Sequence, residues 1–304
     1  MGSPAFAVPS LRALAGAGYR VVAAVSQPDR PAGRDAAVRA PDVKLAAEEL
    51  GIDTFQPGSL RDEAVQARLA DFRADLFIVA AYGKLLPRAV LAMPRRGCLN
   101  VHASLLPRWR GASPIAAAIL AGDAETGVTI MELVAKMGAG PTLARASVSI
   151  GSADTTGSLE YRLSEVGAKL LTDTLPGWLD GAVAAQPQDE SLVTTCSLIK
   201  KEDGHLRSAI LVQEAERAVR ACNPWPGAYV EYRGQRLAIW SARVAEGPPA
   251  AAGTTQIQGK HPAIAFSNGW LVLEEVQRQG SKRMPGQAFL AGERGQLAPF
   301  VGLA

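Results

Sequence analysis

The chain has few cysteine and histidine residues, and their spacing excludes several classes of site. Among its 304 residues there are only three cysteines and three histidines: Cys98, Cys196, Cys222, His102, His205 and His261. An odd number of widely spaced cysteines without a C-x-x-C pair argues against a disulfide framework and against a thiolate metal site. The histidines show no H-E-x-x-H or similar ligand spacing. We therefore predict chemistry without a protein-bound metal, and cysteines that serve as buried small hydrophobic residues.

Long apolar runs and targeting patterns are also missing. No stretch of about 18 to 20 uninterrupted apolar residues is present, as a membrane helix would require, and no basic region with an apolar block opens the chain. A G-x-G-x-x-G dinucleotide fingerprint is absent too, because Gly138-Ala139-Gly140 is followed at once by Pro141. With 48% hydrophobic residues, the chain can build real cores. We expect a globular, cytoplasmic monomer with no membrane contact.

Charge is nearly balanced over the whole chain but is unevenly distributed. The formal net charge is +3, which by itself does not indicate a nucleic-acid partner. From Lys200 onward, however, the sequence contains 13 lysine and arginine residues but only 9 acidic residues. This excess predicts a basic C-terminal domain that could attract a phosphate backbone, although a solvated basic surface would look the same.

The first part of the chain alternates short apolar runs with helical patterns, as β-α-β units with a parallel sheet do. Expected strands are 21–25, 52–55, 76–81, 98–102, 128–134 and 143–150, and expected helices are 42–50, 61–72, 112–120 and 156–179. The fold class predicted is α/β, with a Rossmann-like, doubly wound, mostly parallel sheet. Such sheets bind ligands outside the carboxyl ends of their strands.

The sequence becomes polar and contains proline near residue 184, which indicates a linker. We predict a catalytic domain over residues 1–183, a linker over 184–206 and a second domain over 207–304. In the last range a helical pattern over 208–222 precedes several short apolar runs separated by glycine, asparagine and proline. Strands at this spacing favour a small antiparallel barrel.

The most informative segment runs from Asn100 to Gly111, in the order N-V-H-A-S-L-L-P-R-W-R-G. Side chains alternate along a strand, so Asn100 and His102 point to the same face. Pro107 then restricts the backbone and Gly111 permits a turn. The segment predicts an amide and an imidazole on one pocket wall, beside a shaped loop.

This segment resembles the 10-formyltetrahydrofolate-dependent formyltransferases, and its longer form S-L-L-P-R-W-R-G-A-S-P-I resembles the methionyl-tRNA formyltransferases. Further matches follow in the same order along nearly the whole chain. They are G-S-P-A-F-A-V-P-S-L from Gly2, Q-P-D-R-P-A-G-R from Gln27, A-Y-G from Ala81, A-G-D-A-E-T-G-V-T-I-M from Ala121 and N-P-W-P-G-A from Asn223.

The resemblance implies formyl transfer from 10-formyltetrahydrofolate to the α-amino group of methionine on initiator tRNA, with an OB-like C-terminal domain. Asn100 and His102 would stabilise the oxyanion that forms in the reaction. The loop of Ser104, Leu105, Leu106 and Pro107 would contact the folate. The predicted tRNA contacts are Arg34, Arg39, Arg108, Arg110, Lys200 and Lys201.

Two departures from the family pattern bear on fold and activity. Relatives begin with a short strand before the G-x-P motif, whereas here Met1 directly precedes Gly2. Loss of a central strand would leave its neighbours with unpaired backbone groups. In addition, the family's catalytic aspartate falls on Gly138, so we expect turnover to be impaired. Asp123, Glu125 or Glu132 could substitute if the fold brings one of them close.

Two other functions remain open at this point. A sugar-nucleotide formyltransferase shares the N-x-H and S-L-L-P elements, although the basic C-terminal domain and N-P-W-P-G favour the tRNA enzyme. A non-catalytic folate or tRNA binder would account for Gly138. Restoring aspartate at position 138 separates a damaged enzyme from such a binder.

Overall fold

The fold is that of a computed structural model, described for residues 1–32, 37–207, 210–248 and 250–301. The chain forms two compact units. The first comprises Met1–Pro114, Glu125–Ser149 and Glu160–Ser197, and the second comprises Ile115–Ala124, Ile150–Leu159 and Leu198–Ala304. The passage at Leu198 falls inside the predicted linker, whereas the two short segments of the second unit lie in the range predicted for the catalytic domain.

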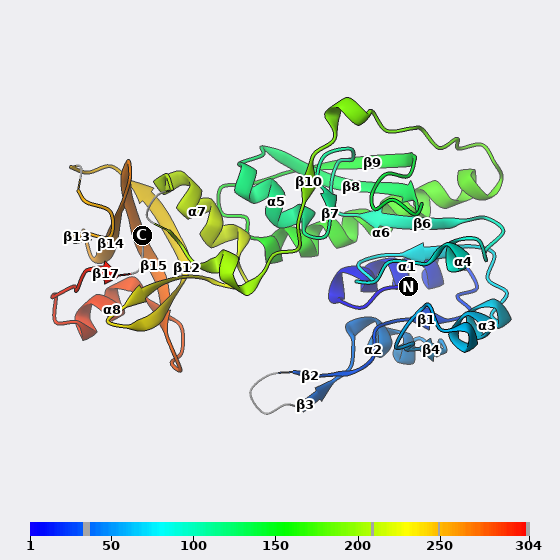
Figure 1. The fold of residues 1–304 in the computed structure, drawn as a ribbon, viewed down its shortest axis with the longest axis horizontal. Helices are drawn as coiled ribbons and strands as arrows, with labels where there is room; N and C mark the ends of the chain where they lie inside the picture. Colours follow the sequence, from blue (N-terminus) through cyan, green and yellow to red (C-terminus); the bar gives the residue numbers. More distant parts are fainter. Residues whose placement is uncertain (33–36, 208–209, 249, 302–304) are drawn as a thin grey trace. The chain divides into compact units, whose positions relative to one another are not determined.

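The first unit is built around a four-stranded sheet in the order β5-β6-β8-β9, of which Figure 1 labels β6, β8 and β9. Its strands are β5 (Phe77–Val79), β6 (Cys98–His102), β8 (Glu125–Glu132) and β9 (Thr142–Ser149). β5 and β6 are parallel, but β8 is antiparallel to both β6 and β9. A separate parallel pair joins β1 (Ala24–Val25) to β4 (Thr54–Phe55). The α/β class is confirmed, and the antiparallel direction of β8 and β9 is an addition to the predicted parallel strands.

Gly2 links β1 to the residue that follows β5. Its N–H donates to the Val25 carbonyl at 2.9 Å, and a parallel bridge joins it to Ala80. The Met1 amino group donates to the Ile78 carbonyl at 2.6 Å, and burial lowers the pKa of this amino group to about 5. Beside these contacts lies a cavity of about 770 Å³ lined by residues of both strands.

Helices connect these strands, and two of them begin with residues that favour a helix N-terminus. The Asp62 carboxylate accepts a hydrogen bond from the Ala64 N–H at 2.9 Å, which caps the start of α3. α1 carries Pro9 in its first turn, where the missing N–H would be unpaired in any case. The helices of the first part are α1 (Val8–Gly16), α2 (Asp42–Glu49), α3 (Glu63–Asp71), α4 (Arg88–Leu91), α5 (Pro114–Ala121) and α6 (Thr156–Leu179), with a 3-10 turn at Ala5–Ala7.

Two small ladders of the first unit were not predicted. An antiparallel ladder pairs β2 (Arg30–Ala32) with β3 (Ala37–Arg39). A short parallel pair joins β7 (Arg110–Gly111) to β10 (Thr195–Cys196). The second pair brings a late segment of the chain onto the loop that follows β6.

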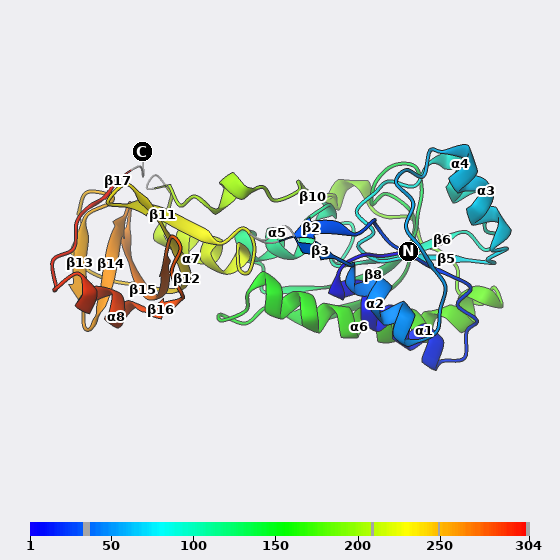
Figure 2. The ribbon, with the colours of Figure 1, turned by 90° about the horizontal axis from the view of Figure 1, so that it is seen from below.

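The second unit contains a seven-stranded antiparallel sheet with two helices of the C-terminal segment, and it also includes nearly all of α5 (Figure 2). The strand order is β13-β14-β15-β12-β11-β17, and β16 pairs with β15. The elements are α7 (Val212–Ala221), β11 (Ala228–Tyr232), β12 (Gln235–Ala245), β13 (Thr255–Gln258), β14 (His261–Phe266), β15 (Gly269–Arg278), β16 (Met284–Pro285), α8 (Gly286–Gly292) and β17 (Phe300–Val301), with a 3-10 turn at Lys201–Gly204 ahead of them. Another 3-10 turn, Glu190–Leu192, belongs to the first unit.

The antiparallel C-terminal sheet that we predicted is present, but its strands do not close into a barrel within the described residues. No ladder joins β13 to β17 among the described residues, so the sheet stays open there. It is nevertheless bent, because the pairing of β12 with β15 shifts its register between Ile239 and Ala242, and such irregularities bend the strands that carry them.

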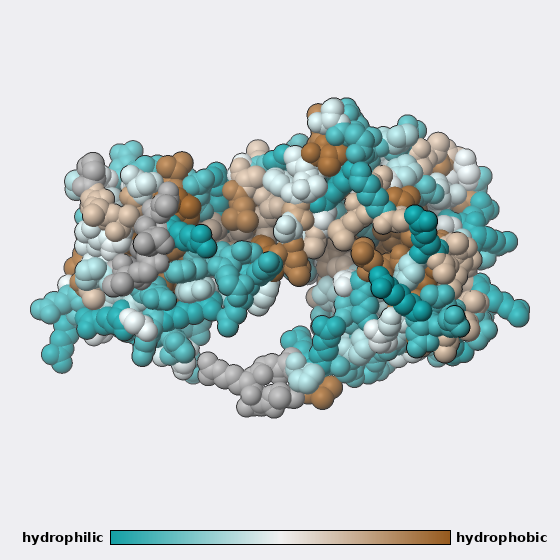
Figure 3. Space-filling model, in the orientation of Figure 1, coloured by the Kyte–Doolittle hydropathy of each residue, from teal (hydrophilic) through white to brown (hydrophobic). Residues whose placement is uncertain are grey.

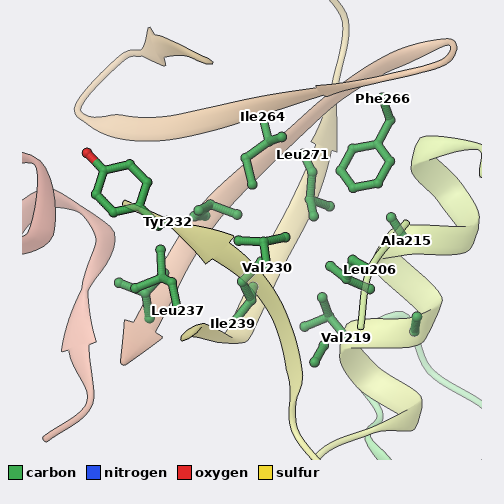
Figure 4. Close-up of a cluster of buried hydrophobic side chains, with 14 of the residues drawn as sticks. Leu206, Ala215, Val219, Val230, Tyr232, Leu237, Ile239, Ile264, Phe266 and Leu271 are labelled. Atoms are coloured by element: carbon green, nitrogen blue, oxygen red, sulfur yellow. The ribbon is translucent and has the colours of Figure 1, made fainter. Parts of the chain in front are cut away.

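α7 packs one face against the sheet and buries Val212, Ala215 and Val219 there. Figure 4 shows side chains from α7, β11, β12, β14 and β15 converging on this core. Phe266 is 2% exposed and Ile239 is fully buried. Hydrophilic residues predominate along the lower edge of this unit in Figure 3.

No helix of the described ranges is both long enough and apolar enough to cross a membrane.

Replacement of Phe266 by alanine should destabilise the second unit by about 3 to 5 kcal/mol, because the cavity left by a buried aromatic ring is only partly refilled. Urea denaturation followed by circular dichroism measures the change in the free energy of unfolding. Ile257→Ala is the matched control on β13, since Ile257 is 47% exposed. Equal losses in the two variants would contradict this description of the core.

Candidate active site

The site is organised by β6, which is held on both edges. Asn100 pairs with Val79 of β5 on one side and with Met131 of β8 on the other, while His102 pairs with Thr129. The alternation predicted from the sequence therefore places Asn100 and His102 on the same face of the strand. Both lie toward its carboxyl end, where an open α/β sheet binds ligands.

His102 is 7% exposed, and its imidazole has one hydrogen-bonding partner in the described chain. Its Nδ1 lies 3.1 Å from the hydroxyl oxygen of Ser104. Burial lowers the pKa of the imidazole to about 4, because the charged form loses its hydration. The ring is therefore neutral at pH 7.

The side chain of Asn100 is half-buried and makes no hydrogen bond within the described chain. Its amide is thus not committed to another protein group. Nε2 of His102 also has no hydrogen-bonding partner in the described chain, and it is not among the fully buried polar atoms that lack one. The two groups can therefore both engage a ligand.

The loop after β6 is fixed by hydrogen bonds that the sequence alone did not reveal. The Thr129 hydroxyl donates to the Ser104 carbonyl at 2.7 Å and accepts from the Leu106 N–H at 3.1 Å. Ser104, Leu106 and Thr129 are all buried. The predicted folate loop is therefore tied to β8 through one side chain, while Leu105 and Pro107 remain half-buried.

Beyond this loop, Arg108 is exposed and its guanidinium lies 4.4 Å from the centre of the Trp109 ring. That distance suits a cation–π contact. Trp109 adopts a positive φ of 61°, and its N–H donates to the Thr194 hydroxyl at 2.9 Å. The segment around Thr194 thus supports the backbone that carries both side chains.

Arg110 is committed inside the protein. It is 4% exposed, its Nε donates to Gln188 at 3.0 Å, and its guanidinium makes an ion pair with Glu190 at 2.7 Å. The same ion pair holds the pKa of the Glu190 carboxyl below its usual value. These contacts make Arg110 a structural link rather than an available phosphate ligand, in contrast to our expectation.

Gly138 lies in the loop between β8 and β9 and belongs to the same network. It has a positive φ of 66°, and a Cβ placed there would lie 3.0 Å from Cβ and Cγ of Arg110. The Gln188 amide donates to the carbonyl oxygens of Gly138 at 2.8 Å and Gly140 at 2.6 Å. Gln188 therefore connects this loop with Arg110, and no sequence signal pointed to it.

No carboxylate of the described chain lies within hydrogen-bonding distance of His102. Glu132 pairs with Leu99 of β6, and burial raises the pKa of its carboxyl, but it makes no contact with the imidazole. Glu125 makes none either, and Asp123 belongs to the second unit. Neither Glu125 nor Glu132 therefore pairs with His102 in place of the aspartate.

The other predicted tRNA contacts vary in their setting. Arg39, Lys200 and Lys201 are exposed, and the Arg39 guanidinium lies 3.6 Å from the Asp42 carboxylate. Arg34 lies outside the described residues.

Within the described chain, no group of three or more histidine, cysteine, aspartate or glutamate side chains forms a metal-binding cluster.

Comparison with known proteins places this geometry in a family. The formyl transferase family matches residues 2–175, and its C-terminal domain matches residues 198–294. A methionyl-tRNA formyltransferase of Methylococcus capsulatus is 46% identical over 290 residues, covering 95% of this chain and 94% of that protein. One from Dechloromonas aromatica is 44% identical over 291 residues, with 96% and 94% covered.

The fold is similar to that of a solved N-formyltransferase of Helicobacter canadensis, in complex with folinic acid and dTDP-3-aminofucose. The TM-score is 0.65 at 14% sequence identity, and the match covers 91% of this chain and 97% of that one. At this identity the likeness concerns the fold alone.

Acidification should destabilise the protein through His102. The folded-state pKa of about 4 lies below the ordinary value of 6.5, so the unfolded chain binds the proton first as the pH falls. Between about pH 6.5 and 4 the wild type should lose on the order of 3 kcal/mol more than a His102→Gln variant. Denaturation curves of both proteins across this range measure the difference. Parallel pH dependences would contradict a buried, neutral His102.

Proposed function

The chain belongs to the methionyl-tRNA formyltransferases of the formyl transferase family, and we propose that it transfers the formyl group of 10-formyltetrahydrofolate to the α-amino group of methionine on initiator tRNA. The whole-length identity of 44–46% to relatives bearing that name supports this substrate pair. Both family domains are present, including the C-terminal one.

The observation that carries the proposal is the shared face of Asn100 and His102 at the end of β6. In the reaction, the amine lone pair attacks the formyl carbon, and the carbonyl oxygen becomes an oxyanion. The bond from that carbon to N10 of the folate then breaks, the amine loses a proton, and N10 gains one. An amide N–H at position 100 suits the oxyanion, and a neutral imidazole at position 102 suits the proton.

The folate is a substrate here, and the loop of Ser104 to Pro107 is its proposed contact. Support comes from the position of this loop directly after His102 and from its attachment to Thr129. The Helicobacter canadensis enzyme of similar fold is described in complex with folinic acid, itself a formylated folate. Leu105 and Pro107 offer half-buried apolar surface suited to the flat ring system.

We propose that turnover is slow because residue 138 is a glycine and carries no carboxylate. A carboxylate partner would favour protonation of the imidazole and speed the proton transfer. Gly138 cannot supply it, and His102 has no acidic partner in the described chain. We therefore propose that proton transfer is slowed at this site and that stabilisation of the oxyanion is not.

For the tRNA we propose phosphate contacts at Arg39 and Arg108 of the first unit and at Lys200 and Lys201 of the second. All four are exposed, and contacts of this kind position a nucleic acid without reading its sequence. Arg110 is left out because Glu190 and Gln188 occupy its guanidinium.

A sugar-nucleotide substrate is the second candidate, favoured by the similar fold of the Helicobacter canadensis enzyme. Activity assays that offer methionyl-tRNA and a dTDP-amino sugar in parallel separate the two. Formylation of the sugar alone would overturn the proposal.

Asn100→Ala should lower kcat for methionyl-tRNA formylation by roughly 10²- to 10³-fold, the usual cost of losing one oxyanion donor. Single-turnover formylation with radiolabelled methionyl-tRNA measures the rate. Asn100→Asp is the matched control, because it preserves the size of the side chain but replaces the donating amide with an acceptor, and it should be equally slow. An unchanged rate in either variant would exclude Asn100 from this role.

Gly138→Asp should raise kcat by roughly 10²-fold or more if a carboxylate is what the site lacks. Aspartate tolerates a positive φ better than most residues, and Arg110 has to yield by a few tenths of an ångström. The same single-turnover assay applies. Gly138→Asn, equal in size and uncharged, should give no gain. Equal gains in both variants would assign the effect to loop geometry, and no gain in either would overturn the proposed deficit.

A further inference from the structure

Ser104 makes two side-chain hydrogen bonds, to the imidazole before it and to a carbonyl after it. Its Oγ lies 3.1 Å from Nδ1 of His102 and 2.7 Å from the carbonyl oxygen of Arg108. Ser104 is fully buried and His102 nearly so, which keeps water from competing for these groups. The Arg108 N–H donates to the Leu105 carbonyl at 3.1 Å, so the turn that carries the acceptor is itself closed.

The proton on this hydroxyl has one consistent position. A carbonyl oxygen can only accept, so the short contact between Ser104 and Arg108 requires the hydroxyl hydrogen. The 2.7 Å separation is typical of an O–H···O bond, and 3.1 Å lies in the range for N–H···O. With its only hydrogen used, Oγ must accept from the imidazole. If the hydroxyl hydrogen pointed to Nδ1 of His102 instead, the Ser104 and Arg108 oxygens would lie 2.7 Å apart without a hydrogen between them.

We propose that Ser104 is a positioning residue that holds His102 in the tautomer protonated at Nδ1 and so leaves the lone pair on Nε2 free. Because the neutral ring carries one N–H, fixing it on Nδ1 decides the role of the other nitrogen. Nε2 has no partner in the described chain. It accepts a proton and does not donate a hydrogen bond to an oxyanion.

The catalytic consequence rests on the proposed function. Asn100 and His102, which the sequence analysis both assigned to the oxyanion, then have different roles. The Asn100 amide supplies the N–H for the oxyanion, and Nε2 of His102 takes the proton that the attacking amine loses and delivers it to N10. A carboxylate is one group that can orient a histidine through Nδ1. Here a hydroxyl does so, backed by the Arg108 carbonyl.

Nitrogen NMR of histidine-labelled protein tests the tautomer without any substrate. The chain has only three histidines, and His102→Gln assigns the signals of His102 by their loss. At pH 7 we expect Nδ1 to show the shift of a protonated ring nitrogen and Nε2 that of an unprotonated one. In Ser104→Ala the Nε2-protonated form should become the major species, while Ser104→Thr should keep the wild-type pattern.

A structural control separates the hydroxyl from general loosening of the loop. Thr129→Val removes the bonds that hold the Ser104 carbonyl and the Leu106 N–H but leaves the Ser104 hydroxyl in place. The tautomer should persist in this variant. Wild-type protein with an unprotonated Nδ1, or equal loss of the tautomer in Ser104→Ala and Thr129→Val, would overturn the proposal.

The kinetic readout is kcat and its pH profile, compared with KM for the folate. Ser104→Ala should lower kcat about 10-fold or more and alter the acidic limb of the profile, and Ser104→Thr should restore both. A change in KM alone would assign Ser104 to folate binding and remove its catalytic consequence. If no variant transfers formyl groups, the proposed function fails, while the NMR result still decides the tautomer.

Discussion

The pairing of β6 on both of its edges is the constraint from which the rest of the site follows. With β5 parallel on one side and β8 antiparallel on the other, β6 cannot rotate or slip by one residue without breaking both ladders. Asn100 and His102 are therefore fixed on one face. The same pairing sets Thr129 opposite His102, where its hydroxyl reaches the loop that follows.

Burial and hydrogen bonding then decide what each group can do. A buried imidazole without a carboxylate partner stays neutral, which makes it a weak but available base. Its single N–H is directed by Ser104, and the Ser104 hydroxyl is directed by the Arg108 carbonyl. The chemistry of His102 thus depends on a main-chain oxygen six residues later, through one intervening side chain.

Main-chain and side-chain contacts hold the loop that carries Gly138. The backbone carbonyls of its loop bind Gln188, which in turn binds Arg110, whose charge is balanced by Glu190. The loop is thereby held without any side chain at position 138. The positive φ suits glycine, and the close approach of Arg110 leaves little room for a larger residue. The local structure at this position therefore does not depend on a side chain of residue 138.

The sequence by itself determined the α/β class, most strand and helix positions, and the shared face of Asn100 and His102, because these follow from local periodicity and from short motifs. The partners of Arg110, the link through Gln188 and the hydrogen bonds of Ser104 and Thr129 were decided only by tertiary structure. They join residues that are distant along the chain or depend on the path of a turn, and no periodic pattern encodes such distances. The open edge of the C-terminal sheet has the same origin, since spacing predicts strands but not whether the first and last of them pair.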